Sequence, residues 1–442
     1  MSSLKLPWRS HPAFWMVLTA FLLRIALMLY THSYEMETVQ TSPGQLGTQD
    51  HFGIGYETGA IAASLANGHG FSSPFGGDTG PSAWVGPVYA GILALIFKIF
   101  GTYSIASSIV MLAVNSLFSA LTCLPMWGIG MRTVGRNATL IGCWIWTAGV
   151  SFMEWPLTWI WDMPLSALIV ATMFLLTLQL VEDESAWRWN VWGLWCGLAA
   201  LTNPALITCI VISGLWLVWR RWQQKRDWLK KTVLAACLCI VMISPWLVRN
   251  RMVFGQWVFL RSNFGFELGL GNYQYSSGFG WRGKHPMVNK RIFEQYKSVG
   301  EIAFLEEKKE EAYTYVEGHP GEFLRLSTER AWSFWAGTFL KYAYMDGNER
   351  MKTYWPWSLA MVIGLLGYWA KDRKLAVYFT AITLLYPLPY YFTYPQTRYR
   401  HAIEPLLLLL CGYMLAEVSQ SIRQRSKSFP ARTRGLKNVT AP

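Results

Sequence analysis

The feature that most constrains this chain is a series of long apolar runs separated by short basic segments. Of its 442 residues, 52% are hydrophobic and only 15% are charged, whereas a soluble protein carries about 25% charged residues. A helix needs about 20 apolar residues to cross the ~30 Å hydrocarbon core of a bilayer. The sequence therefore predicts an all-α polytopic membrane protein with about ten spans: Ala13–Tyr30, Ser104–Met126, Ala138–Met153, Pro164–Val181, Val191–Leu201, Pro204–Val218, Val233–Leu247, Pro356–Trp369, Leu375–Phe392 and Ala402–Leu415.

The basic residues predict how these spans are oriented. The net charge of +13 is concentrated in short runs between apolar segments, which is typical of cytoplasmic loops and argues against a nucleic-acid partner. Both termini are then cytoplasmic, and membrane lipids are an expected partner. The runs are Lys5 and Arg9; Arg132 and Arg136; Arg220, Arg221, Lys225, Arg226, Lys230 and Lys231; Lys371, Arg373 and Lys374; and the tail from Arg423 to Lys437.

This orientation divides the chain into parts. Residues 1–247 form an N-terminal transmembrane module that includes a first outer loop, 32–103. Residues 248–355 form a long outer region, residues 356–418 the C-terminal transmembrane helices, and residues 419–442 a basic cytoplasmic tail.

Two further segments, 85–100 and 323–344, are apolar but interrupted by charge. We expect amphipathic helices that lie on the membrane surface. If both crossed the membrane instead, the parity of the spans would be preserved and the loop between them would change side.

Glu57 opens a short apolar helix in the stretch "GIGYETGAIAASL", just beyond the first span. A carboxylate in a first turn is favoured by the helix dipole, so a purely structural role is one reading. The other reading is functional, because a compact glycine-rich loop follows at once and also carries His69. Such loops commonly approach ligands closely.

Asp162 lies between the third and fourth predicted spans, among tryptophans and directly before Met163-Pro164. That position suits an N-cap. A carboxylate near membrane depth is also a candidate functional residue, and both readings stay open.

Arg398, Tyr399, Arg400 and His401 form a basic group at the outer end of the last span. Their side of the membrane is opposite to that of the other basic runs. Two arginines offer planar donors that suit phosphate oxygens, whereas the alternative is snorkelling to lipid head groups. Glu404 is one turn away from Arg400 and is placed to pair with it.

The third outer segment begins with further polar residues on a glycine-containing loop, which suits a sugar or a phosphate; a solvated loop is the alternative. They are Arg249, Arg251, Arg261, Asn263, Glu267 and Asn272.

Several other chemistries have no signal in the sequence. There is no outward Asp-x-Asp pair, no phosphate-binding loop ending in Lys-Ser/Thr and no Gly-x-Ser-x-Gly turn. The histidines lack zinc-ligand spacing. No metal site and no required cofactor are predicted, although dependence on a divalent metal stays open.

The order of these motifs resembles the GT-C class of membrane glycosyltransferases. Within that class the chain is similar to glycosyltransferase family 39, the dolichyl-phosphate-mannose–protein mannosyltransferases, and to its bacterial relatives that include aminoarabinose transferases. The strings that carry the resemblance are "YETGAIAASLANGHGFSSPFGGDTGPSAWVGPVYAGILALIFKIFG", "GLAALTNPAL", "SPWLVRNRMVFGQWVFLRSNFGFELGLGN", "HPGEFLRLSTERAWSFW" and "RYRHAIEPLLLLL".

The resemblance implies a GT-C-like bundle and assigns roles to particular residues. The acid of the family's first loop, usually an aspartate, falls on Glu57, and the second acid falls on Asp162. The basic contacts to phosphate fall on Arg398 or Arg400, and less surely on Arg249 or Arg251. The glutamate at position 57 departs from the family pattern, and so does the lack of the large soluble C-terminal domain that some relatives have.

The resulting hypothesis is an inverting glycosyltransferase that moves a hexose or pentose from a polyprenyl-phosphate donor. The acceptor is a lipid, a glycan or a protein on the outer, periplasmic face, and the protein is expected in a bacterial inner membrane. Glu57 acts as general base, and Asp162 orients the acceptor or assists Glu57. The alternatives are a transporter or flippase for a lipid-linked or polar solute, and a non-catalytic assembly protein.

Overall fold

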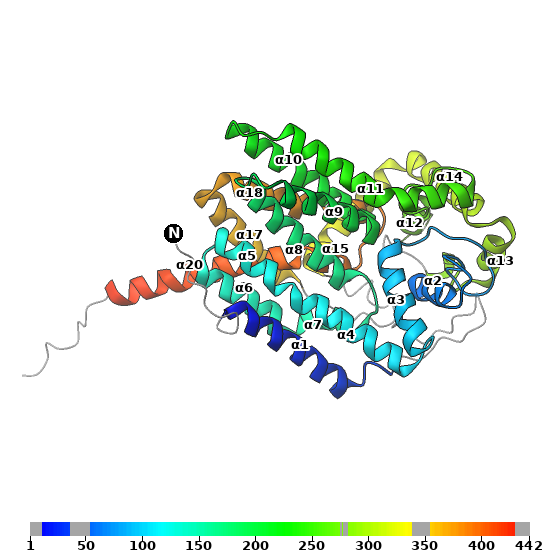
Figure 1. Cartoon of the computed structure of the whole chain (residues 1–442), viewed down its shortest axis with the longest axis horizontal. Coiled ribbons are helices and arrows are strands. Elements are labelled where there is room, and N and C mark those ends of the chain that lie inside the picture. The colour runs from blue at the N-terminus through cyan, green and yellow to red at the C-terminus, as the bar shows by residue number, and fades with distance from the viewer. Residues whose placement is uncertain (1–10, 36–53, 275, 277–281, 338–353, 429–442) are drawn as a thin grey trace, which may run out of the picture.

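The chain folds into one elongated bundle of helices with a group of shorter helices at one end (Figure 1). This computed structural model describes residues 11–35, 54–274, 276, 282–337 and 354–428. Within these ranges there is no strand, and Ser72 and Pro81 form an isolated bridge. The predicted all-α class is confirmed.

The helices of the bundle come from both halves of the chain, and most of them alternate in direction through short loops. Those before residue 185 are α1 (Pro12–Thr31), α4 (Ile105–Leu121), α5 (Cys123–Arg132), α6 (Arg136–Ala148), α7 (Val150–Thr158) and α8 (Met163–Leu180). Those after it are α9 (Ala186–Thr202), η2 (Pro204–Leu206), α10 (Ile207–Gln223), α11 (Leu229–Phe254), α17 (Trp355–Lys371), α18 (Arg373–Leu385), α19 (Leu388–Phe392), η4 (Thr397–Ala402) and α20 (Glu404–Ser428).

The remaining helices belong to the first and third outer segments. They are α2 (Tyr56–Ala66), α3 (Pro87–Phe100), α12 (Phe264–Gly271), η3 (Arg282–Lys284), α13 (Lys290–Val299), α14 (Glu301–Gly318) and α15 (Pro320–Ala336). Figure 1 shows α2, α3, α12, α13 and α14 together at the end of the bundle opposite the C-terminal part of α20. The two outer segments, far apart in sequence, thus lie on the same end.

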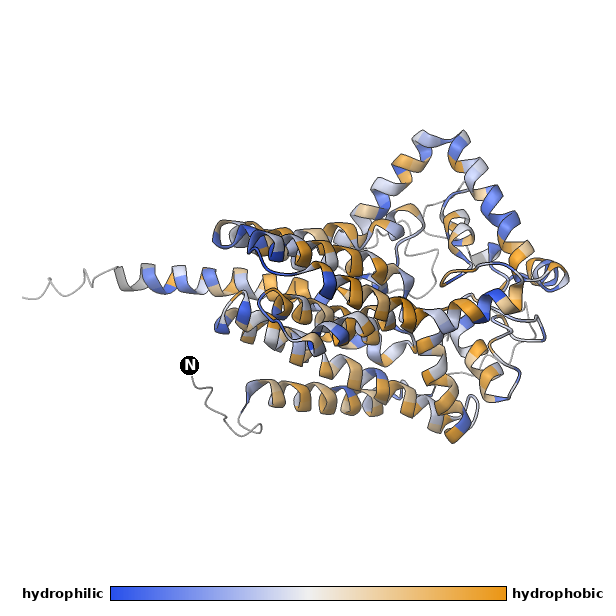
Figure 2. Cartoon of the chain, turned by 45° about the horizontal axis from the view of Figure 1, so that its top comes forward, coloured by the Kyte–Doolittle hydropathy of each residue, from blue (hydrophilic) through white to orange (hydrophobic). Residues whose placement is uncertain are grey.

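Seven of the described helices are long and apolar enough to cross a membrane: Pro12–Thr31, Ile105–Arg132, Met163–Leu180, Pro204–Gln223, Leu229–Phe254, Arg373–Phe392 and Glu404–Gln424. Each overlaps a predicted span. The other three predicted spans fall on α6 with its continuation α7, on α9 and on α17, which are shorter helices. Figure 2 shows hydrophobic residues along the middle of the bundle and hydrophilic residues gathered toward its ends, as expected for an integral membrane protein.

Both segments predicted to lie on the membrane surface are helical where they are described. The first is α3, which starts at Pro87 as expected from its fixed φ angle. The second contains α15, which ends at Ala336, and the prediction for residues 338–344 lies outside the described residues.

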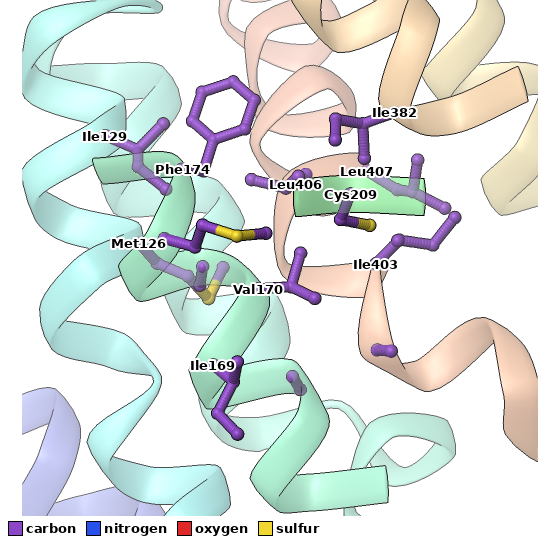
Figure 3. Close-up of a cluster of buried hydrophobic side chains, with 14 of the residues drawn as sticks. Met126, Ile129, Ile169, Val170, Phe174, Cys209, Ile382, Ile403, Leu406 and Leu407 are labelled. Carbon is purple, nitrogen blue, oxygen red and sulfur yellow. The ribbon is translucent and has the colours of Figure 1, made fainter. Parts of the chain in front are cut away.

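The apolar core lies where helices from both halves of the chain meet. Figure 3 shows side chains from α5, α8, α10, α18 and the start of α20 pointing toward one another. Close packing of this kind provides dispersion energy that lipid does not replace. The labelled residues are Met126, Ile129, Ile169, Val170, Phe174, Cys209, Ile382, Ile403, Leu406 and Leu407.

The buried side chain of Arg24 stabilises a helix break between α6 and α7. The helix formed by residues 136–158 is interrupted at Gly149, between α6 and α7, so the last carbonyls of α6 need donors. Arg24 of α1 is fully buried and donates to the carbonyls of Trp146, at 3.0 Å, and Thr147, at 3.1 Å. A charged donor inside the bundle is therefore used to complete backbone hydrogen bonds.

Helices α6 and α20 cross at two glycines. A Cβ on Gly142 would lie 2.7 Å from the carbonyl oxygen of Leu408. A Cβ on Gly412 would lie 2.3 Å from the carbonyl oxygen of Ala138. Small residues allow backbones to approach this closely in membrane helix pairs.

We expect the Gly412→Ala variant to be destabilised by about 1–3 kcal/mol, because the added methyl forces the two backbones apart. Thermal unfolding of the detergent-solubilised protein measures this as a lower melting temperature. Gly91→Ala is the matched control, since a Cβ on the exposed Gly91 of α3 meets open space. Equal melting temperatures for both variants would contradict the close crossing.

Candidate active site

The site begins with the close approach of the first outer loop to the end of the bundle. A Cβ on Gly55 would lie 2.7 Å from the carbonyl oxygen of Ile160 and 2.9 Å from the ring of Trp161. Only glycine allows this contact, and α2 starts at the next residue. The contact therefore brings the first turn of α2 to the segment that ends in Asp162.

Glu57 lies in that first turn, as predicted, and its 9% exposure leaves it almost buried. One carboxylate oxygen is 3.1 Å from Nε2 of His285. The backbone N–H of Met287 donates to Nδ1 of the same ring, at 3.2 Å. Because Nδ1 accepts this bond, a neutral His285 carries its proton on Nε2 and donates it to Glu57.

The ring of His285 is fixed by aromatic neighbours. The rings of Phe75, Trp84 and Phe266 surround it edge-on, with centroids 5.4, 6.1 and 5.6 Å away. These contacts come from the first loop and from α12, so the histidine joins both outer segments.

Glu57 remains easily ionised despite its burial. Burial is the largest influence and opposes ionisation, but the hydrogen bond and charge of His285, a backbone hydrogen bond and the charge of Arg261 outweigh it. Together they lower the pKa of Glu57 below its usual value. The carboxylate is thus a proton acceptor near neutral pH.

Asp162 occupies the N-cap position of α8, but its carboxylate makes no side-chain cap. One carboxylate oxygen instead accepts hydrogen bonds from Nδ2 of Asn203, at 2.9 Å, and from Oγ of Ser166, at 3.2 Å. Burial raises the pKa of Asp162, although Asn203, Arg261, Ser166 and Arg398 oppose the shift. The side chain is therefore held by neighbouring side chains rather than used to start the helix.

Glu267 is the third carboxylate of the site. Asn263 donates to it at 2.7 Å, and Tyr394 also hydrogen-bonds to it. Burial raises the pKa of Glu267, and the like charge of Glu57 adds to the increase, whereas Arg261 opposes it. Asn263 and Glu267, both predicted as substrate-binding residues, thus contact each other beside Glu57.

The positive charge of Arg261 is an influence that these three acids share. Its positive charge acts on Glu57, on Asp162 and on Glu267. Its Nε donates to the carbonyl oxygen of Trp84, at 2.8 Å. Among the described residues, its two terminal nitrogens make no hydrogen bond, so they can serve an anionic ligand.

Arg398 approaches the same place from η4. Its guanidinium lies over the rings of Trp161, Trp159 and Tyr399, at 4.3, 5.1 and 5.3 Å, and its charge acts on Asp162. Arginine stacked on aromatic rings remains charged while its planar edge can bind oxyanions. Arg398 and Tyr399 are therefore placed near the acidic residues.

Arg400 and His401 point into the bundle instead. Arg400, 2% exposed, donates to Oγ of Ser358 at 2.6 Å and lies over the rings of Trp335 and Tyr354. His401 lies 2.9 Å from Glu404 and stacks on Trp146. The predicted pairing of Arg400 with Glu404 is present, with 3.8 Å between Nε and Oε1. The structure thus does not bring these two basic residues to the carboxylates.

Arg249 fixes the first outer loop to the end of α11. Its guanidinium donates to the carbonyls of Phe71 and Ser82, both at 2.7 Å. Between these two residues the backbone turns through glycines with positive φ, including Gly76 and Gly80. A buried carboxylate, Glu301, holds the next residue by accepting the N–H of Ala83, at 2.7 Å.

The other predicted binding residues lie apart from the acids. Arg251 is exposed and bonds the carbonyl of Gly255, which ends α11. Asn272 is buried and is hydrogen-bonded to Arg330 and to backbone carbonyls. His69 is exposed in the loop after α2.

From the sequence, His285 was not a binding candidate, and Arg261 was one of the polar residues of the third outer segment with no role of its own. His285 had no distinctive spacing, because its partner lies in another outer segment. Arg261 was placed near the membrane. Its position two residues before Asn263, a predicted binding residue, was the signal that could have indicated a binding role for Arg261. Among the described residues, no group of three or more His, Cys, Asp or Glu side chains could hold a metal ion.

A family model described as dolichyl-phosphate-mannose-protein mannosyltransferase matches residues 84–248. This range includes Asp162 but excludes Glu57, Arg261, Glu267 and His285. The match confirms the predicted similarity to that family and supports a glycosyltransferase. No curated protein matches the chain by sequence.

The fold is similar to that of AglB, the oligosaccharyltransferase of Archaeoglobus fulgidus. In its complex with an inhibitory peptide and a dolichol-phosphate, AglB aligns with a TM-score of 0.51 and 14% identity, over 97% of this chain and 53% of its own. An oligosaccharyltransferase of the same organism, tethered with an acceptor peptide, aligns with a TM-score of 0.53 and 13% identity, over 96% of this chain and 51% of its own. The chain therefore spans about half the length of AglB, and the predicted GT-C-like fold is confirmed.

We expect the Arg249→Met variant to release the loop between Phe71 and Ser82, because two carbonyls lose a charged donor. Hydrogen–deuterium exchange of this loop should accelerate about tenfold or more, as loss of ~1.5–3 kcal/mol per charged hydrogen bond implies. Arg251→Met, which removes a neighbouring arginine bonded to Gly255 alone, should leave the loop unchanged. Unchanged exchange in Arg249→Met would show that other contacts hold the loop.

Proposed function

We propose that the chain is an inverting glycosyltransferase that takes a sugar from a polyprenyl-phosphate donor. The observation that carries the proposal is the convergence of Glu57, Asp162 and Glu267 on Arg261, with Arg398 beside them. An ionised carboxylate next to arginines combines a base with anion binding. The family match and the fold shared with AglB, which binds a dolichol-phosphate, support the same class of donor.

In this mechanism Glu57 is the general base. It takes the proton of an acceptor hydroxyl as the hydroxyl oxygen attacks the anomeric carbon from the face opposite the phosphate. The bond between the anomeric carbon and the phosphate oxygen breaks, and its electron pair stays on that oxygen. A single displacement inverts the configuration, and no external oxidant or reductant is needed.

The arginines stabilise the leaving group. The free terminal nitrogens of Arg261 and the guanidinium of Arg398 bind the polyprenyl phosphate as its negative charge increases. Asp162 and Glu267, whose pKa values are raised by burial, orient hydroxyl groups of the sugar or acceptor. Tyr399, Asn263 and the other predicted binding residues line the donor and acceptor sites or support the residues that do.

We further propose that the site faces the outer, periplasmic side of a bacterial inner membrane and that both termini are cytoplasmic. The basic residues support this orientation, because Arg220 and Arg221 lie in the last turn of α10 and Lys230 and Lys231 in the first turn of α11. The acceptor is then a lipid, a glycan or a protein on that side. The same orientation gives the proposed division of the chain into two transmembrane parts, the outer region 248–355 and a basic tail.

The Glu57→Gln variant should lower kcat by at least ~100-fold while keeping donor binding, because the amide cannot accept a proton. Transfer from a lipid-phosphate sugar is measured in detergent, and donor binding by native mass spectrometry. Glu306→Gln, at an exposed glutamate of α14, is the matched control and should retain full activity.

Transfer in detergent, where no second compartment exists, also distinguishes the enzyme from a transporter. If the wild-type protein transferred no sugar from any lipid-phosphate donor, the proposed activity would be refuted. If Glu57→Gln were fully active, the base would have to be another residue.

His285 should control the acidic limb of the pH–rate profile. Activity falls as pH decreases through the pKa of Glu57, which the His285 hydrogen bond helps to lower. His285→Phe keeps an aromatic ring but removes the donor, so burial is less opposed and the limb should move to higher pH. His285→Gln, whose amide N–H can replace Nε2–H, should return the limb toward its original position.

The measurement is kcat/KM against pH for the three proteins. A proportional loss at every pH in His285→Phe, with no movement of the limb, would show that the histidine has a structural role only.

A further inference from the structure

The chain that follows α11 turns back along the same helix. Gly255 ends α11, because its φ of 69° lies in the left-handed region. Nδ2 of Asn250 then donates to the carbonyl of Val258, at 3.0 Å, and Nε1 of Trp246 donates to the carbonyl of Leu260, at 2.9 Å. Residues 256–260, called the return segment below, therefore run antiparallel to the last turns of α11.

The depth of the return segment follows from the length of α11. The sequence predicted that this span ends at Leu247, but α11 continues to Phe254 and is one candidate span. At about 1.5 Å per residue, the helix from Val233 to Phe254 covers about 32 Å, which matches a ~30 Å hydrocarbon core. Trp246 lies about 12 Å before Phe254 by the same rise. The carbonyl of Leu260, bonded to Trp246, thus lies below the outer boundary of the core.

Irregular backbone at this depth requires satisfied carbonyl groups, because lipid offers no donors. Asn250, 0% exposed, and Trp246, 8% exposed, provide donors from within the protein. Among the described residues, Nδ2 of Asn250 and Nε1 of Trp246 donate to no other acceptor, and Oδ1 of Asn250 accepts a hydrogen bond from Arg249. These hydrogen bonds satisfy two backbone carbonyls of the return segment, as irregular backbone at membrane depth requires.

The return segment has an inner and an outer face. Val258 and Leu260 are buried and pack against Ala200, Leu201 and Trp246. Trp257 and Phe259 point outward and are 62% and 72% exposed. This alternation is that of an extended chain with one buried side.

The outer face continues an apolar stripe on α11. The helix exposes large hydrophobic side chains along its length, namely Val233, Leu234, Ile240, Val241, Val248, Met252 and Val253. Trp257 and Phe259 add exposed aromatic side chains beside the last turns of α11. Exposed aromatic residues of this kind are typical of the membrane–water boundary.

We propose that the return segment re-enters the outer leaflet and that Trp257 and Phe259 contact lipid acyl chains there. The next residue after Leu260 is Arg261, the arginine whose charge acts on the three carboxylates. Insertion of the return segment therefore sets Arg261 within the outer leaflet, below the level of the lipid phosphates. A donor anchored in the same leaflet can reach the arginine without leaving the membrane.

Site-specific photocrosslinking of the full chain in phosphatidylethanolamine–phosphatidylglycerol nanodiscs tests the lipid contact. p-Benzoylphenylalanine at position 257 or 259 should form phospholipid adducts as efficiently as at position 241, an exposed position in the span of α11. Position 313, an exposed tyrosine of α14, is the matched control and should form few adducts. Only variants that elute as monodisperse protein are compared.

Absence of lipid adducts at 257 and 259, with adducts present at 241, would overturn the proposal. Adducts between two protein chains at these positions would overturn it as well, because they would show a protein partner on this face.

The link to the donor rests on the proposed function. The double variant Trp257→Ser and Phe259→Ser should raise the KM for a long-chain polyprenyl-phosphate donor in nanodiscs about tenfold. The KM for a short-chain, water-soluble donor should not change, and Tyr313→Ser should change neither. An equal increase for both donors would refute the link, whereas an inactive wild-type protein would refute the enzyme and leave the crosslinking result standing.

Discussion

The proposed site depends on the electrostatic attraction between the guanidinium of Arg261 and three carboxylates. Glu57, Asp162 and Glu267 are each disfavoured as anions by burial, and each is stabilised as an anion by this one guanidinium. Without the arginine, three acids in largely apolar surroundings would compete for protons and repel one another. The arginine belongs to the segment after α11, Glu57 to the first outer loop and Asp162 to the start of α8. Charge compensation therefore favours the fold in which these three segments meet at one end of the bundle.

Burial of a charge does not by itself indicate a site, and this chain shows the distinction. Arg24 donates to the carbonyls at the end of α6, and Arg249 donates to two carbonyls of the first loop. Arg400 is enclosed by Ser358, Glu404 and aromatic rings. Terminal nitrogens of all three residues donate to groups of the protein itself, which is typical of structural roles, although Nε of Arg24 and Nε of Arg400 have no hydrogen-bond partner among the described residues. Arg261 differs, since within the described residues its terminal nitrogens have acids nearby and no hydrogen-bond partner.

The sequence was sufficient for features that depend on local pattern. Apolar length predicted the seven long helices, and the position of Glu57 in a first turn and the pairing of Arg400 with Glu404 followed from helical spacing. It was insufficient where the deciding contact joins distant segments. The N-cap reading of Asp162 was local, but Asn203, from the end of α9, binds the carboxylate instead. His285 reaches Glu57 only because α12 and the first loop pack around its ring, and no spacing encodes that contact.

The unequal pKa shifts of the three acids suit a site that must accept an anion. Three ionised carboxylates would repel a lipid phosphate more strongly than one arginine could attract it. Burial raises the pKa of Asp162 and Glu267, whereas His285 and Arg261 keep that of Glu57 low. Among the three acids, Glu57 is therefore the one whose ionisation the surroundings favour most. The hydrogen bond from His285 distinguishes Glu57 from the other two carboxylates. A base and an anion-binding arginine can therefore belong to the same proposed site.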